Sequence, residues 1–258
     1  FMLPVGLLVH TSWRHAGVIL AGSFWSAAWH SLVLAALAAT LAVAVGLMLA
    51  YARRVAANGF TRPAVRLAGF GYAVPGTVLA IGLLIPLAGL DNWIDGVLRR
   101  WLGLSSGLLL SGTIFAMVLA YVIRFLAVAL GALEEGFGRI SPSLDAAART
   151  LGETALSTLV RVHLPMLRPA VGAAGLLVFV DCMKELPATL LLRPFNFETL
   201  ATHVYGLASL EQFEHASLGA LAIVIVGLAP VLLLHHAVSS GRAGHGSLGR
   251  RPTRSGAR

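Results

Sequence analysis

Three ionisable residues stand close together at the end of an otherwise apolar stretch. Asp181 lies three positions before Lys184 and four before Glu185, so on a helix the three side chains share one face. Charges at membrane depth are costly and usually face protein or water. Two interpretations stay open: the three residues line a path that attracts a cation, or they form a compensated cluster beside a helix break at Pro187. We favour the second. Arg124, in an earlier apolar stretch, either pairs with this cluster or extends toward the membrane surface.

Nine histidines make metal binding a hypothesis to consider. His203 and His215 share a segment with three acidic residues, namely Glu198, Glu211 and Glu214. No HxxxH pair supports a tight site, however, so we expect no metal site on this chain.

Other catalytic patterns are missing from the sequence. It contains no HExxH or GxxxxGK[ST] motif, which argues against a zinc-dependent hydrolase and against a phosphate-binding loop. The single cysteine, Cys182, excludes an internal disulfide framework. We therefore expect a chain that is not an enzyme and binds no cofactor of its own.

The amino-acid composition indicates the class of protein to which these residues belong. Of the 258 residues, 57% are hydrophobic and only 12% are charged, and the mean hydropathy is +0.83. A soluble domain has about 45–50% apolar and about 25% charged residues. These values exclude an ordinary soluble enzyme and a disordered chain, and they indicate an integral membrane protein.

Five long apolar blocks predict the membrane spans. They cover about 27–51, 68–90, 108–133, 170–187 and 217–238. The blocks are solidly apolar rather than alternating, so helices are favoured over a barrel. The run at 1–9 is too short to span, and we expect it to be the end of a helix whose beginning is missing or displaced. The prediction is an all-α polytopic bundle of five to six transmembrane helices over residues 1–238.

Basic residues between the blocks predict the orientation. Alternate segments hold thirteen arginines on one side and four on the other. This bias places the arginine-rich loops and the C-terminus in the cytoplasm, so the net charge of +8 reflects topology rather than nucleic-acid binding. The basic tail, 239–258, has no apolar period and is expected to be disordered.

The long loop of about 134–169 carries the most specific pattern. Ser141 and Pro142 can begin a helix, Gly152 breaks it, and a second helix is expected from Glu153 to just before Leu164 and Pro165. Two short amphipathic helices joined at a glycine suit docking into a partner's groove. They also suit resting on lipid. The residues alone leave both interpretations open.

The spacing within this loop resembles the EAA loop of ATP-binding-cassette (ABC) importer permeases. That pattern is Glu-Ala-Ala, three residues, Gly, nine residues, an aliphatic residue, one residue and Leu-Pro. The matching positions here are Ala146, Ala147, Ala148, Gly152, Val162, Leu164 and Pro165. Ala146 stands where the family has an acidic residue, and Asp145 comes one place earlier. A surface salt bridge or helix cap at that point is therefore weakened or supplied by Asp145.

The resemblance implies a type I (MetI-like) importer fold and a division of labour between subunits. Residues of about 149–158, with Arg149 and Glu153 beside Gly152, would form the helix that couples the permease to a separate ABC ATPase, which uses the ATP. A periplasmic substrate-binding protein and a second permease half or subunit would complete the transporter in the bacterial inner membrane.

A second resemblance concerns the substrate. Residues 184–202, KELPATLLLRPFNFETLAT, and 73–84, AVPGTVLAIGLL, resemble permeases of the ferric-iron class, which are often fused double-length chains. The chain would then correspond to a C-terminal half. Thiamine, sulfate, polyamine and phosphonate remain alternative substrates. An ion-coupled secondary transporter is an alternative from another class, although it would predict inverted repeats and acidic residues in mid-membrane helix breaks.

Overall fold

The computed structural model describes residues 2–14, 22–56, 59 and 61–242. Over these residues the fold is entirely helical, without strands. The elements are α1 (Met2–Arg14), α2 (Gly22–Val55), α3 (Thr61–Phe70), η2 (Gly71–Ala73), α4 (Gly76–Leu102), α5 (Ile114–Gly138), α6 (Pro142–Thr150), α7 (Ala155–Thr158), η3 (Leu159–His163), α8 (Leu164–Met183), α9 (Pro187–Leu192), α10 (Leu200–Ser209) and α11 (Phe213–Arg242).

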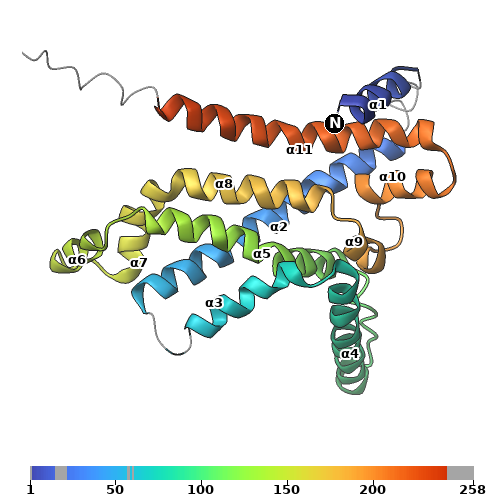
Figure 1. Ribbon diagram of the computed structural model, residues 1–258. Helices are drawn as coiled ribbons and strands as arrows, with labels where there is room; N and C mark the ends of the chain where they lie inside the picture. Colours follow the sequence, from blue (N-terminus) through green and yellow to red (C-terminus); the bar gives the residue numbers. More distant parts are fainter. Residues whose placement is uncertain (1, 15–21, 57–58, 60, 243–258) are drawn as a thin grey trace, which may run out of the picture.

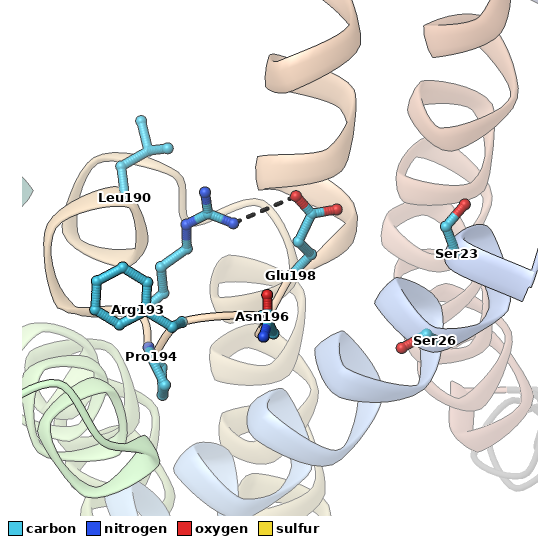
Figure 2. Close-up of a pocket in the computed structure, with 8 residues that line it drawn as sticks. Ser23, Ser26, Leu190, Arg193, Pro194, Asn196 and Glu198 are labelled. Atoms are coloured by element: carbon cyan, nitrogen blue, oxygen red, sulfur yellow. Dashed lines mark hydrogen bonds and ion pairs between the residues drawn. The ribbon is translucent and has the colours of Figure 1, made fainter.

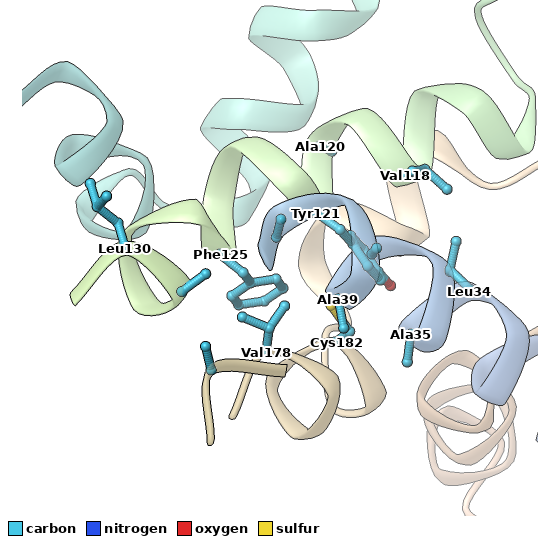
Figure 3. Close-up of a cluster of buried hydrophobic side chains, with 14 of the residues drawn as sticks. Leu34, Ala35, Ala39, Val118, Ala120, Tyr121, Phe125, Leu130, Val178 and Cys182 are labelled. Atoms are coloured by element: carbon cyan, nitrogen blue, oxygen red, sulfur yellow. The ribbon is translucent and has the colours of Figure 1, made fainter. Parts of the chain in front are cut away.

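Helices α2, α5 and α8 form the centre of the molecule, and α11 lies along the bundle against α1, α8 and α10 (Figure 1). Small residues allow the central helices to approach closely. Ala38, Ala42, Ala120 and Ala174 are all fully buried. Figure 3 shows the aromatic rings of Tyr121 and Phe125, both on α5, among aliphatic side chains of α2 and α8. The predicted all-α membrane bundle is confirmed.

Among the described residues, four helical segments are long and apolar enough to cross a membrane. They are Gly22–Val55, Gly76–Leu102, Ile114–Gly138 and the continuous stretch Ala155–Met183. Helix α11 is 30 residues long and has an apolar part, Phe213–Leu228. Helix α11 runs to Arg242, so it includes the first residues of the predicted tail; 243–258 lie outside the described residues.

The predicted span of 68–90 was wrong as one uninterrupted helix. The chain breaks between Gly71 and Pro75, because Pro75 favours an extended conformation at the preceding Val74, whose ψ is 127°. Gly71 permits a close approach here, since a Cβ on it would lie 2.0 Å from the Ile123 carbonyl oxygen of α5. Helix α4 then leaves the central bundle (Figure 1) and packs mainly against α5 and α9.

Two other predicted spans were displaced. Residues 108–113 form a loop before α5, held by the buried Asp91 carboxylate, which accepts hydrogen bonds from the backbone N–H groups of Leu109, Leu110 and Ser111. The span predicted at 170–187 begins earlier, at Leu164, and ends at Met183. The helix is interrupted after Met183, and α9 begins at Pro187, where we predicted a helix break.

Candidate functional site

The loop between α5 and α8 has the predicted pair of short helices. Helix α6 begins after Ser141, whose hydroxyl accepts a hydrogen bond from the Ser143 N–H, and α7 begins after Thr154, which caps it in the same way. Between them Gly152 has a φ of +80°, a conformation that favours glycine. Helices α6 and α7 lie together at one end of the bundle, at the opposite end from α9 and α10 (Figure 1).

The expected end of the second helix before Leu164 and Pro165 was wrong. The chain continues through the π-helical turn η3 into α8, so that Ala155–Met183 is one helical stretch. In η3 the N–H of Leu164 donates to the carbonyl of Leu159, five residues earlier. Pro165 lies in the first turn of α8, where the missing N–H is tolerated. The loop is thereby joined rigidly to a membrane-spanning helix.

Asp145 anchors this loop to the bundle. Its carboxylate accepts hydrogen bonds from Arg54 Nη2 at 2.7 Å and Arg54 Nε at 2.9 Å, and it lies 2.7 Å from His163 Nε2. His163 is fully buried, and the Arg54 and Asp145 side chains are only 15% and 14% exposed. The ion pair expected of Asp145 therefore exists, but it is largely buried, and the helix cap comes from Ser141 instead.

The Asp145 node, defined as Asp145, Arg54 and His163, connects four parts of the chain. Arg54 lies in the last turn of α2 and also donates to the carbonyls of Phe137 at 2.7 Å, near the end of α5, and of Ile140 at 2.9 Å, just after it. Burial of Asp145 opposes its ionisation, yet hydrogen bonds from Arg54 and His163 outweigh it and hold the pKa of this carboxyl below its usual range. A charged Asp145 thus ties α2, α5, α6 and η3 together.

The outer surface of the loop carries exposed apolar side chains beside charged ones. The exposed fraction is 82% for Leu151, 71% for Leu156 and 52% for Val160. Glu153 pairs with Arg161 at 3.0 Å beside them. Of the other predicted positions, Ala146, Ala147 and Arg149 are exposed, whereas Ala148 is buried and Val162 and Leu164 are partly buried. The loop therefore presents a surface of leucines and charges on an internally anchored frame.

The charged residues at the end of α8 do not form one cluster. Lys184, which is 61% exposed, pairs with Asp181 at 2.8 Å. Glu185 is buried and pairs instead with Arg124 of α5 at 3.3 Å. Arg124 thus pairs with an acid rather than extending to the membrane surface.

The Arg124–Glu185 pair lies where two helix breaks meet. Arg124 Nη1 donates to the Val74 carbonyl at 2.8 Å, and the Ala188 N–H donates to Glu185 Oε1 at 3.3 Å. Gly76 leaves room for this pair, since a Cβ there would lie 2.7 Å from Glu185 Oε1. The contacts favour the interpretation of a compensated pair that stabilises the breaks before α4 and α9.

A cavity of about 620 Å³ lies at the other end of the molecule, between the start of α2 and the loop after α9. Figure 2 shows the Arg193 guanidinium extended toward the Glu198 carboxylate, at 3.4 Å. His203 Nδ1 lies 3.2 Å from the other oxygen of Glu198. No group of three or more His, Cys, Asp or Glu side chains suited to a metal ion occurs among the described residues.

Sequence reasoning missed the partners of Asp145. Arg54 entered only as one of the arginines that indicate orientation, and His163 fills the position of the EAA pattern that accepts any residue. Only the coincidence of an unusual acid at 145 with a histidine at 163 could have suggested their contact.

The known proteins that this chain resembles in sequence are named as transport permeases. No family model matches the chain. It is 30% identical over 233 residues, 90% of the chain, to the Fe(3+)-transport system permease protein FbpB 2 of Haemophilus influenzae, and 25% identical over 212 residues to a ferric transport system permease of Actinobacillus pleuropneumoniae. The chain spans less than half of these relatives, 42% and 28% of their lengths. It spans 80% of a putative 2-aminoethylphosphonate permease of Salmonella typhimurium, at 24% identity.

Solved structures of low sequence identity share the fold. A bacterial alginate ABC transporter chain superposes with a TM-score of 0.71 at 16% identity, covering 95% of this chain and 88% of the other. A chain of the MetNI methionine ABC transporter gives a TM-score of 0.55 at 15% identity, covering 81% and 93%. The chain is therefore a multi-pass membrane protein with the fold of ABC importer permeases, related in sequence to the ferric-iron class.

Proposed function

We propose that this chain is the membrane-spanning permease part of an ATP-driven importer and that ferric iron is its substrate. The observation that carries the proposal is the loop around Gly152, whose exposed leucines lie on a frame anchored by Asp145. Such an apolar surface on short helices suits insertion into a groove of a partner. The partner is a separate ABC ATPase, which hydrolyses the ATP.

Coupling would follow from how the loop is built. A force on α6 and α7 reaches α8 through the continuous helix at η3, and it reaches α2 and α5 through the Asp145 node. Closure of an ATPase dimer would thereby rock the central helices between inward- and outward-open states. A substrate-binding protein on the outer side and a second permease half complete the transporter, with the Gly152 loop on the cytoplasmic side of the inner membrane.

Sequence similarity supports iron as the substrate. The relative with 30% identity over 90% of this chain is named as an Fe(3+)-transport permease. An oxyanion is a second candidate, because the 2-aminoethylphosphonate permease and a probable molybdenum permease of Haloferax volcanii match over 80% and 84% of their own lengths. Uptake of ferric iron, molybdate and 2-aminoethylphosphonate by the complete transporter in vesicles distinguishes them.

The coupling proposal is tested by placing charges on the loop surface. In L151D/L156D both changed side chains are exposed, so folding should be preserved while docking of the ATPase is lost. We expect copurification of the ATPase and ATP-dependent uptake to fall at least about tenfold, which corresponds to about 1.4 kcal/mol. Leu104→Asp, also exposed but in the loop after α4, is the control. Full uptake in L151D/L156D, or an equal loss in the control, would contradict the proposal.

A further inference from the structure

Three arginines line a cavity where α2 ends and α3 begins. The cavity has a volume of about 450 Å³ and is lined by Arg53 of α2 and by Arg62, Val65 and Arg66 of α3. Arg62 and Arg66 are four residues apart, so they project from the same face of α3. We call this cavity the arginine pocket. Its volume is within the range of small-molecule sites.

Positive charge in the arginine pocket is only partly balanced. Arg53 Nη1 pairs with Glu134 Oε1 of α5 at 2.5 Å. Within the part of the chain that the structure describes, no carboxylate forms an ion pair with Arg62 or Arg66. Two guanidinium groups therefore face the cavity without a counter-charge from the described residues. Guanidinium groups suit phosphate, because their planar donors match its oxygens in pairs.

The surroundings of the pocket indicate a lipid as the source of that phosphate. Helix α3 is amphipathic: Val65 is buried against the bundle, while Leu67 and Phe70 are 69% and 64% exposed. It follows directly on the long apolar helix α2 and lies beside α5. Helix α3 runs beside α5 from the end of α2 toward Ile123 in the middle of α5, which Gly71 approaches closely, so the arginines lie near the end of the bundle and the apolar residues lie deeper. Exposed Leu67 and Phe70 would then contact acyl chains next to the arginines.

We propose that the arginine pocket binds the phosphate of an anionic phospholipid in the leaflet on the side of the Gly152 loop. Basic pockets between membrane helices on the cytoplasmic side are suited to such headgroups. A soluble phosphate or an acidic protein would use the arginines but would leave Leu67 and Phe70 without a role. The inference depends on the membrane position of α2 and α3 and not on the transported substrate.

Native mass spectrometry of the purified full chain tests this proposal. The probes are cardiolipin and phosphatidylglycerol, with phosphatidylcholine as the neutral lipid and inorganic phosphate as the soluble anion. We expect R62Q/R66Q to bind the anionic lipids about 30-fold more weakly, since each basic residue near the surface contributes a severalfold to tenfold factor. R100Q/R139Q removes the same charge at two exposed arginines outside the pocket and should bind as the wild type does.

A gain-of-binding variant guards against misfolding. Glu134→Gln removes the acid that neutralises Arg53, so binding of anionic lipid should become several times tighter. Glu135→Gln, the exposed neighbour, is the matched control. Any one of four results would overturn the proposal. Phosphatidylcholine binds as tightly as the anionic lipids, or inorganic phosphate displaces the bound lipid. Alternatively, R62Q/R66Q binds anionic lipid as the wild type does, or this variant loses only its assembly with the ATPase and keeps its lipid binding.

Discussion

Asp145 is the residue on which the position of the Gly152 loop depends most directly. Its carboxylate joins Arg54 and His163, and both ionic side chains are largely buried. A buried charge-assisted pair is costly to break, because the remaining partner keeps its charge without compensation. Ala146 is exposed, whereas the Asp145 side chain is largely buried, so Asp145 serves as an internal anchor and not as the surface salt bridge or helix cap that the resemblance led us to expect.

Replacing Asp145 by asparagine tests this role. We expect the free energy of unfolding to fall by about 2 kcal/mol, because Arg54 loses its charged acceptor. Thermal denaturation of the purified chain measures the change. Glu153→Gln is the control, since its partner Arg161 is 74% exposed and the pair contributes less than about 1 kcal/mol. Equal losses in the two variants would show that Asp145 has no special anchoring role.

The pKa of Asp145 predicts a pH dependence. Because the folded-state pKa lies below the ordinary value of 3.8, the ionised carboxylate stabilises the folded chain above that pH. The stabilisation is lost as the pH falls through the folded-state pKa. We expect the difference in melting temperature between wild type and Asp145→Asn to be constant above about pH 5 and to shrink below about pH 4. A difference that grows on acidification would contradict this assignment; Arg54, His163, Tyr51 and Arg149 are the neighbouring titratable groups.

Among the secondary-structure elements, the breaks before α4 and α9 supply the polar contacts that hold these two helices to α5. The break before α4 leaves the Val74 carbonyl free to accept from Arg124, and the break before α9 places Glu185 beside the same arginine. Tyr121 of α5 adds a hydrogen bond to Thr189 of α9 at 2.5 Å. One continuous helix, α5, thus holds the starts of α4 and α9 through one ion pair and two hydrogen bonds.

Glu185→Gln should destabilise this junction. Arg124 would keep its charge without a carboxylate, at a cost of about 3 kcal/mol in the free energy of unfolding. Asp181→Asn is the matched control, because its partner Lys184 is largely exposed and the loss should stay below about 1 kcal/mol. Chemical denaturation in detergent measures both. Should Asp181→Asn prove the more damaging, the arginine pair is not what holds α4 and α9.

For the whole molecule, the orientation in the membrane is the main open prediction. The arginine bias places the Gly152 loop in the cytoplasm. The loop that contains Phe195, which is fully exposed, lies at the other end of the bundle, near α9 and α10. The only cysteine, Cys182, is buried, so the chain is already suited to labelling of introduced thiols.

Phe195→Cys and Leu151→Cys test the orientation. A thiol reagent that cannot cross the membrane should label position 195 in intact cells and position 151 only after the membrane is opened. The unsubstituted chain, in which Cys182 is 4% exposed, should stay unlabelled. Labelling of position 151 in intact cells would reverse the predicted topology.

Much of the fold was predictable from local sequence. Solid apolar blocks predicted the membrane helices, and the residues around Gly152 predicted two short helices, because length, apolar content and capping residues act within a few positions of the chain. Two of the errors occurred at prolines. Pro75 interrupts a block that is apolar throughout, and Pro165 continues a helix that it was expected to end, because the π turn η3 accommodates it.

Apolar length and motif spacing are local properties of the chain, so they were enough to predict a helical membrane bundle with two short helices around Gly152. Which charged side chains pair with one another depends instead on how the helices pack in three dimensions. Asp145 forms an ion pair with Arg54, 91 residues away in the sequence. Glu185 pairs with Arg124 and not with the adjacent Lys184. Arg53 lines one cavity together with Arg62 and Arg66. Local periodicity predicts partners three or four positions apart, whereas these contacts depend on the rotation and depth at which whole helices pack.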